Sequence, residues 1–244
     1  MRAKRFSTIA ALAIAIFLSS VASSQKRRSR IRLIEPGQFH GDEIVAKSHE
    51  RWLALFVKRH RAVLRYSRIR ITKVFDDVTD YGTHQKTGKR VSVDGSDEPM
   101  FLIKHAAMLA AGPLISVFKQ QANFERTLEK EPVHLKLGRR GYILKVVSPD
   151  KNPLPCRESQ FPTNAELVLI SGNSKQTLYT LDGCGNDPSW YLLWAGDLDR
   201  DGKLDLYVNV TQHYDVSQRK LFLSSQAGKN RLVREVASFE TGGC

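Results

Sequence analysis

Four aspartates occupy odd-numbered positions of a nine-residue window near the C-terminal end of the chain. They are Asp197, Asp199, Asp201 and Asp205, at positions 1, 3, 5 and 9 of the window. Carboxylate oxygens at this spacing, with the backbone carbonyl of Lys203 at position 7, can surround one hard cation at about 2.3 to 2.6 Å. Without a cation, carboxylates held so close would repel one another and their pKa values would rise. The spacing therefore predicts a cation site.

The ligand types favour calcium. Oxygen-only ligands favour calcium over zinc or copper, and six or more of them favour it over magnesium, which keeps more of its own water. An EF-hand fits poorly, because its loop ends in a glutamate at position 12, where this loop has Val208. Residues 206–210 alternate as a half-buried strand. The alternative interpretation is a solvated hairpin turn at Asp201-Gly202.

The stretch from Trp194 to Leu206 resembles the calcium loop of FG-GAP and VCBS-type repeats, which also build the propeller of integrin α-subunits. In that family the loop joins two β-strands and its aspartates bind calcium. The resemblance implies the same role for the four aspartates here. The motif occurs once in this chain, whereas a propeller needs about four to eight blades. The resemblance therefore implies the ion site without the propeller.

Short apolar runs separated by turn signals surround this loop, and their spacing is typical of a mainly β protein. We expect antiparallel sheets arranged as a sandwich or barrel. A hairpin is expected to turn at residues 58–61, and residues 106–111 to form a helical turn or a covering loop. The predicted strands span residues 66–74, 90–93, 100–104, 114–118, 142–147, 166–171, 177–181, 190–194, 206–210 and 220–224.

The first 22 residues are typical of a secretory signal peptide. A basic start is followed by the apolar run 9–18 and by Ser20-Val21-Ala22, a small-residue cleavage site. The apolar run is too short to span a bilayer, and no other stretch reaches the roughly 18 apolar residues that a membrane helix needs. We therefore expect an exported protein, periplasmic or extracellular, with no transmembrane segment.

Composition shifts suggest a division of the remaining chain. Residues 23–35 form a basic, flexible N-terminal segment, and residues 36–122 form an N-terminal β region. The polar stretch 123–132 is a possible linker, and residues 133–244 form a C-terminal β domain that carries the calcium loop.

Three cysteines are present: Cys156, Cys184 and Cys244. In an exported chain one disulfide is expected, with one cysteine left over. The pair Cys156 and Cys184 closes the shortest loop, but Cys184 with Cys244 would hold the C-terminal tail beside the calcium loop. Three cysteines at these spacings make no zinc site.

The positive charge indicates one class of partner. The formal net charge is +13, and it falls to +10 without the signal peptide. Residues 51–73 contain eight Lys or Arg and no acid, and residues 66–74 alternate as a strand with basic residues on the solvent face. Such a face attracts anionic surfaces. The alternative function is therefore a calcium-dependent adhesion or envelope-binding module for anionic polysaccharide or another polyanion.

Catalytic motifs are absent from the sequence. No zinc-protease helix, nucleophile elbow, phosphate-binding loop or dinucleotide fingerprint occurs. His213-Tyr214-Asp215 could serve acid–base chemistry or form a surface turn, and Cys184 lies between two glycines but favours a disulfide. The sequence thus predicts an exported, non-catalytic β protein in which Ca²⁺ stabilises the loop 197–205. A secreted hydrolase with an unrecognised site is the remaining alternative.

Overall fold

The computed structural model describes residues 31–58, 61–118, 126–128, 131–150, 156 and 161–242. The predicted signal peptide, residues 23–30 of the predicted basic segment and Cys244 lie outside these residues. The same holds for residues 123–125 and 129–130 of the predicted linker.

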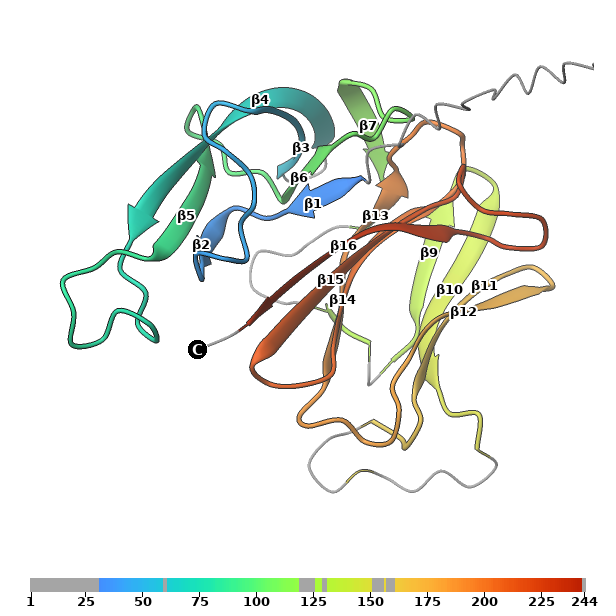
Figure 1. Cartoon of the computed structure of the whole chain (residues 1–244). Coiled ribbons are helices and arrows are strands. Elements are labelled where there is room, and N and C mark those ends of the chain that lie inside the picture. The colour runs from blue at the N-terminus through green and yellow to red at the C-terminus, as the bar shows by residue number, and fades with distance from the viewer. Residues whose placement is uncertain are drawn as a thin grey trace, which may run out of the picture.

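The described residues form two antiparallel sheets (Figure 1). The larger sheet has 12 strands: β1 (Arg32–Ile34), β2 (Gly37–Phe39), β3 (Arg51–Lys58), β4 (Arg61–Val74), β5 (Gly88–Val93), β6 (Phe101–Lys104), β7 (Gly112–Ser116), β8 (Arg126–Thr127), β13 (Ser189–Asp197), β14 (Asp205–Thr211), β15 (Val216–Leu223) and β16 (Arg234–Gly242). The smaller sheet has four strands: β9 (Val133–Leu137), β10 (Arg140–Val147), β11 (Glu166–Ser171) and β12 (Ser174–Thr180).

Nine strands of the larger sheet curl into a nearly closed, barrel-like layer. Their order is β1-β6-β3-β4-β7-β13-β14-β15-β16, and the two ends of this path, β1 and β16, contact each other. The rings of Phe101 on β6 and Tyr207 on β14 meet across the inside, with centroids 4.8 Å apart. With Trp52, Trp194 and Leu221 they belong to the first hydrophobic core, which fills this barrel-like layer.

The four-stranded sheet covers the other face of β13–β15. In Figure 1 the yellow-green strands β9 and β10 lie beside the orange and red strands β13–β16. Leu144 and Leu169 of the small sheet share a second hydrophobic core with Trp190, Val208 and Phe222 of the large one. Strands β13 to β15 therefore lie between two cores, and all seven residues of β14 are buried.

The structure confirms the mainly β prediction with antiparallel, barrel-like sheets. The predicted strands fall within β4–β7 and β10–β15, or extend one or two residues beyond them, and β3 pairs with β4 as the expected hairpin. Residues 106–111 contain no helix. Two expectations need correction. Strands β1, β2, β8, β9 and β16 were not predicted, and β14 is buried on both faces because the second sheet covers it.

The large sheet contains strands from both sides of the predicted linker. Strand β7 pairs with β13, and within the linker region Arg126–Thr127 form β8, which also pairs with β13. Residues 32–34 of the predicted N-terminal segment form β1.

A disulfide joins Cys156 to Cys184, whose Cα atoms are 5.5 Å apart. This decides between the two pairings that the sequence left open, and such a bond is typical of an oxidising, extracytoplasmic compartment. Among the described residues, no helix has the length and apolar character needed to cross a membrane.

Candidate metal centre

The aspartate-rich loop connects two neighbouring antiparallel strands. Asp197 is the last residue of β13 and Asp205 is the first residue of β14, where it lies opposite Gly196. The strands thus hold the two ends of the loop side by side. Inside the loop, Arg200 and Gly202 adopt positive φ angles of 63° and 78°, which turn the chain back on itself.

Two buried leucines anchor the loop to the body of the protein. Leu198 packs in the first core and Leu204 packs in the second, and both are fully buried. On the outside, the Arg200 guanidinium donates hydrogen bonds to the carbonyls of Ala110 at 2.9 Å and Pro113 at 3.3 Å. Leu198 and Leu204 therefore fix the loop to the two cores, and the aspartate side chains of the loop are free to point toward one another.

Three of the four aspartates come together. Asp197, Asp199 and Asp205 each offer one carboxylate oxygen, and these oxygens all lie within 4.8 Å of one another. Asp197 and Asp205 are buried, and Asp199 is half-buried. Such a group of oxygen ligands could hold a metal ion.

Two oxygens of this group lack a hydrogen-bond partner among the described residues. Asp197 accepts a bond from the Gly202 N–H at 3.0 Å through Oδ2, but its Oδ1 is buried without a partner. Asp199 accepts a bond from the Asp201 N–H at 3.3 Å through Oδ1, but its Oδ2 is likewise buried and unpartnered. Buried polar atoms are nearly always satisfied, and a bound cation could satisfy both of these negatively charged oxygens.

Asp205 is the most deeply buried member of the group. Its Oδ2 accepts a bond from the Leu198 N–H at 2.6 Å, and its Oδ1 accepts bonds from the Ser224 N–H at 2.8 Å and hydroxyl at 3.0 Å. Burial, with the nearby charge of Asp199, raises the pKa of Asp205 to about 7. Burial also raises the pKa of Asp197. The site thus disfavours negative charge unless a cation is bound.

The fourth aspartate has other partners. Asp201 Oδ1 accepts bonds from the Lys203 N–H at 2.8 Å and the Ser224 hydroxyl at 2.9 Å, and its Oδ2 lies 3.6 Å from the Lys203 ammonium. Asp201 is therefore outside the group of three. Its role as a ligand, and that of the Lys203 carbonyl, remain predictions. Ser224 was missed by sequence reasoning, because it lies 19 residues beyond Asp205.

No protein family, curated protein or solved structure matches this chain. The assignment of the site therefore rests on its own residues.

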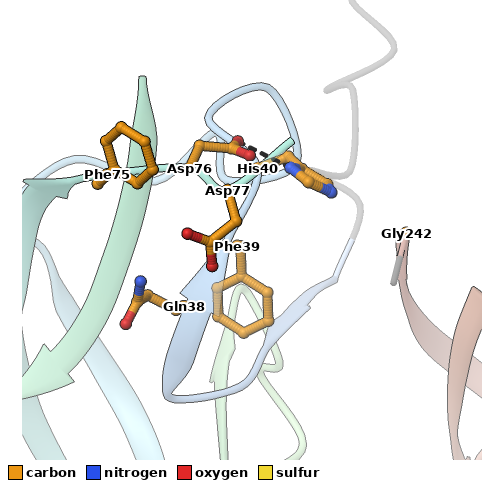
Figure 2. A pocket seen from close by; sticks show the side chains of 7 residues that line it. All are labelled: Gln38, Phe39, His40, Phe75, Asp76, Asp77 and Gly242. Carbon is orange, nitrogen blue, oxygen red and sulfur yellow. Dashed lines mark hydrogen bonds and ion pairs between the residues drawn. The ribbon is translucent and has the colours of Figure 1, made fainter. Parts of the chain in front are cut away.

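A pocket lies beside the C-terminal end of β4. This pocket of about 240 Å³ is lined by residues of β2, β16 and the segment after β4, and Figure 2 shows His40 and Asp76 joined at its edge. His40 Nδ1 lies 2.7 Å from Asp76 Oδ2. The hydrogen bond to Asp76 raises the pKa of His40, and the bond to His40 lowers the pKa of Asp76 to about 2. The pair is thus an imidazolium–carboxylate ion pair at mildly acidic pH.

The described histidines and cysteines do not form a recognisable catalytic site. No hydroxyl or thiol of the described residues bonds to His40. His213 and Asp215, for which the sequence left acid–base chemistry or a surface turn open, contact each other. The other ring nitrogen of His213 lies 2.7 Å from Asn186 Nδ2, so both nitrogens are engaged. Cys184 is part of the disulfide and is not a free nucleophile.

Proposed function

We propose that this protein is an exported, calcium-stabilised β protein in which one Ca²⁺ ion holds the turn between β13 and β14. Asp197, Asp199 and Asp205 would be its side-chain ligands. The observation that carries this proposal is the pair of buried, unpartnered oxygens, Asp197 Oδ1 and Asp199 Oδ2, within a group of three aspartates. A bound cation would satisfy both atoms and neutralise the group.

The donor set supports calcium over other metals. All three candidate side-chain ligands offer carboxylate oxygens, and the group contains no histidine or cysteine. Oxygen ligands suit hard cations, and calcium accepts the irregular geometry of a loop more readily than magnesium. The proposed export would place the protein where weak, millimolar calcium sites are filled.

The role proposed for the ion is structural. The loop joins two central strands, and its leucines reach both cores, so repulsion among the aspartates would weaken the packing at this point. A ligand that binds only the folded state stabilises it by RT ln(1 + [Ca]/Kd), which is about 2.7 kcal/mol at 100 times Kd. For a protein of this size that corresponds to about 5 to 10 °C in Tm.

The test is thermal unfolding of the full chain in excess EDTA and in millimolar calcium. The variant carries Asp197→Asn and Asp199→Asn, which keep the side-chain shape and remove two charges. We expect calcium to raise the Tm of the wild type but not that of the variant. In EDTA the variant should be no less stable than the wild type, because the repulsion that calcium offsets is already gone.

A matched control removes the same charge elsewhere. Asp182→Asn with Asp187→Asn changes two exposed aspartates outside the loop, and this protein should respond to calcium as the wild type does. The proposal fails if calcium leaves the wild type unchanged, or if it shifts the loop variant equally. An equal or larger shift with magnesium at the same concentration would overturn the choice of calcium while leaving a cation site.

A further inference from the structure

Strands β2, β5 and β4 form a three-stranded part of the large sheet with two different faces. Strand β5 pairs with β4 on one side and with β2 on the other. One face is apolar and packs in or against the first core; it carries Phe39, Ile69, Ile71, Val91 and Val93. Because side chains alternate along a strand, the residues between these point to solvent.

The solvent face is rich in arginine. Arg68 and Arg70 lie on β4, Arg90 lies on β5, and Arg51 lies on the adjoining strand β3. All four side chains are exposed. We call this set the arginine face.

The register brings these like charges together. Arg51 lies directly opposite Arg68 on the paired strand. Arg70 and Arg90 are diagonal neighbours, because Arg70 pairs with Ser92 and Thr72 pairs with Arg90. Like charges opposite one another across a sheet are destabilising, so this arrangement lowers the stability of the sheet in the absence of a counter-charge.

The protein itself supplies little of that counter-charge. Asp94, which follows β5, lies 3.1 Å from Arg70. Arg51 and Arg68 have no carboxylate partner among the described residues, and Arg90 donates to the neutral amide of Gln38 at 2.8 Å. Of these four guanidinium groups, only that of Arg70 is paired with a carboxylate within the described part of the chain.

We propose that the arginine face binds an anionic polysaccharide, a glycan chain bearing carboxylate or sulfate groups. Guanidinium groups bind such planar or tetrahedral oxyanions through two parallel hydrogen bonds. Alternate residues of a strand lie about 6.5 to 7 Å apart, and neighbouring strands about 4.8 Å apart, so the face presents a row of donors across three strands. Gln38, Thr72 and Ser92 add neutral hydrogen-bonding groups that suit sugar hydroxyls.

A glycan suits this face better than a nucleic acid. Single-stranded nucleic acids gain much of their affinity from bases stacked on open aromatic rings. Among the described residues of strands β2 to β5, the exposed aromatic ring is that of Tyr66, and the Arg51 guanidinium lies 3.9 Å from its centroid. That ring face is already covered. The inference does not depend on the metal site, which uses other strands.

The experiment measures binding of the full chain to heparin, a sulfated glycan, over a series of salt concentrations. The variant is Arg68→Gln with Arg90→Gln. We expect about tenfold weaker binding at low salt and a shallower fall of affinity with salt, because two charge contacts are lost. The matched control is Arg139→Gln with Arg140→Gln, two exposed arginines on the β9–β10 turn, which should bind as the wild type does.

Three results would overturn the proposal. They are no binding of wild type to heparin at low salt, equal weakening in both double variants, and no weakening in either. A second arm uses single-stranded DNA of similar charge. If DNA binds as tightly as heparin and depends equally on Arg68 and Arg90, the choice of a glycan is wrong. The calcium-induced rise in Tm should be the same in both variants as in the wild type, which separates this test from that of the metal site.

Discussion

The hydroxyl of Tyr207, on β14, donates a hydrogen bond of 2.5 Å to the carboxylate of Glu35, the residue after β1 and 172 positions earlier in the chain. The tyrosine is fully buried, and Nε of Arg219 lies 3.4 Å from the other oxygen of Glu35. Burial and the charge of Glu35 raise the pKa of Tyr207 well above its usual value, so the phenol remains a donor. This hydrogen bond connects the end of β1 to β14, a central strand of the barrel-like layer.

Replacing Tyr207 with phenylalanine should lower the free energy of unfolding by about 1 to 2 kcal/mol. The ring still fills the core, but Glu35 loses the donor of its short hydrogen bond in a mostly buried position. Urea unfolding would measure the change. Tyr81→Phe, at an exposed tyrosine, is the control and should have little effect. Equal losses in the two proteins would show that the Glu35 contact contributes nothing.

Ser224→Ala should weaken both the fold and calcium binding. The hydroxyl donates to Asp205 at 3.0 Å and lies 2.9 Å from Asp201, so its removal leaves the buried Asp205 carboxylate with fewer donors. We expect a loss of about 1 to 2 kcal/mol in EDTA, measured by urea unfolding. We also expect a smaller calcium-induced rise in Tm. Ser225→Ala, at the exposed neighbour, should change neither quantity.

Gly196→Ala should be strongly destabilising. A β-carbon at this position would lie 2.2 Å from the Ile115 carbonyl oxygen and 2.5 Å from the Trp194 ring. Because β7 pairs with β13 here, the backbone would have to move, at a cost of at least about 2 kcal/mol. Thermal unfolding would measure this. Gly141→Ala is the control, since nothing lies within 4 Å of its added carbon, and a similar loss there would contradict the steric argument.

The His40–Asp76 pair should make stability depend on pH. The pKa of His40 is raised above 6.5, so its contribution is present below that pH and is lost as the pH rises through the raised value. The pKa of Asp76 is lowered from 3.8 to about 2, so its contribution is present above 3.8 and is lost as the pH falls toward 2. The free energy of unfolding of the wild type should therefore exceed that of His40→Gln by the largest amount between about pH 4 and 6.5.

Urea unfolding of both proteins at pH 5 and pH 9 would test this, and the difference should be larger at pH 5. The control is His84→Gln, at an exposed histidine, for which we expect no such trend. If the stability difference between wild type and His40→Gln instead grew toward pH 9, His40 and Asp76 would not stabilise the fold as an ion pair.

Local features of this protein could be predicted from its sequence. The aspartates of the loop are close in the chain, so any hairpin at this point brings several of them together, and the prediction identified all three members of the group. Strand β4 was predicted because its residues alternate over many positions. Strand β16 was missed, since Phe239 is the single large apolar side chain buried along it. Strand β9 was also missed, although its residues alternate between buried and exposed positions.

Other features depend on contacts between distant parts of the chain, and only the tertiary structure decided them. The β14–β15 pairing brings Ser224 to Asp205, and the β3–β4 register sets Arg51 opposite Arg68. Cys156, rather than Cys244, is the partner of Cys184, and their Cα atoms are 5.5 Å apart. The burial of both faces of β14 follows from the second sheet. Spacing along the chain determines which residues can cluster locally, whereas strand pairing determines which distant residues meet.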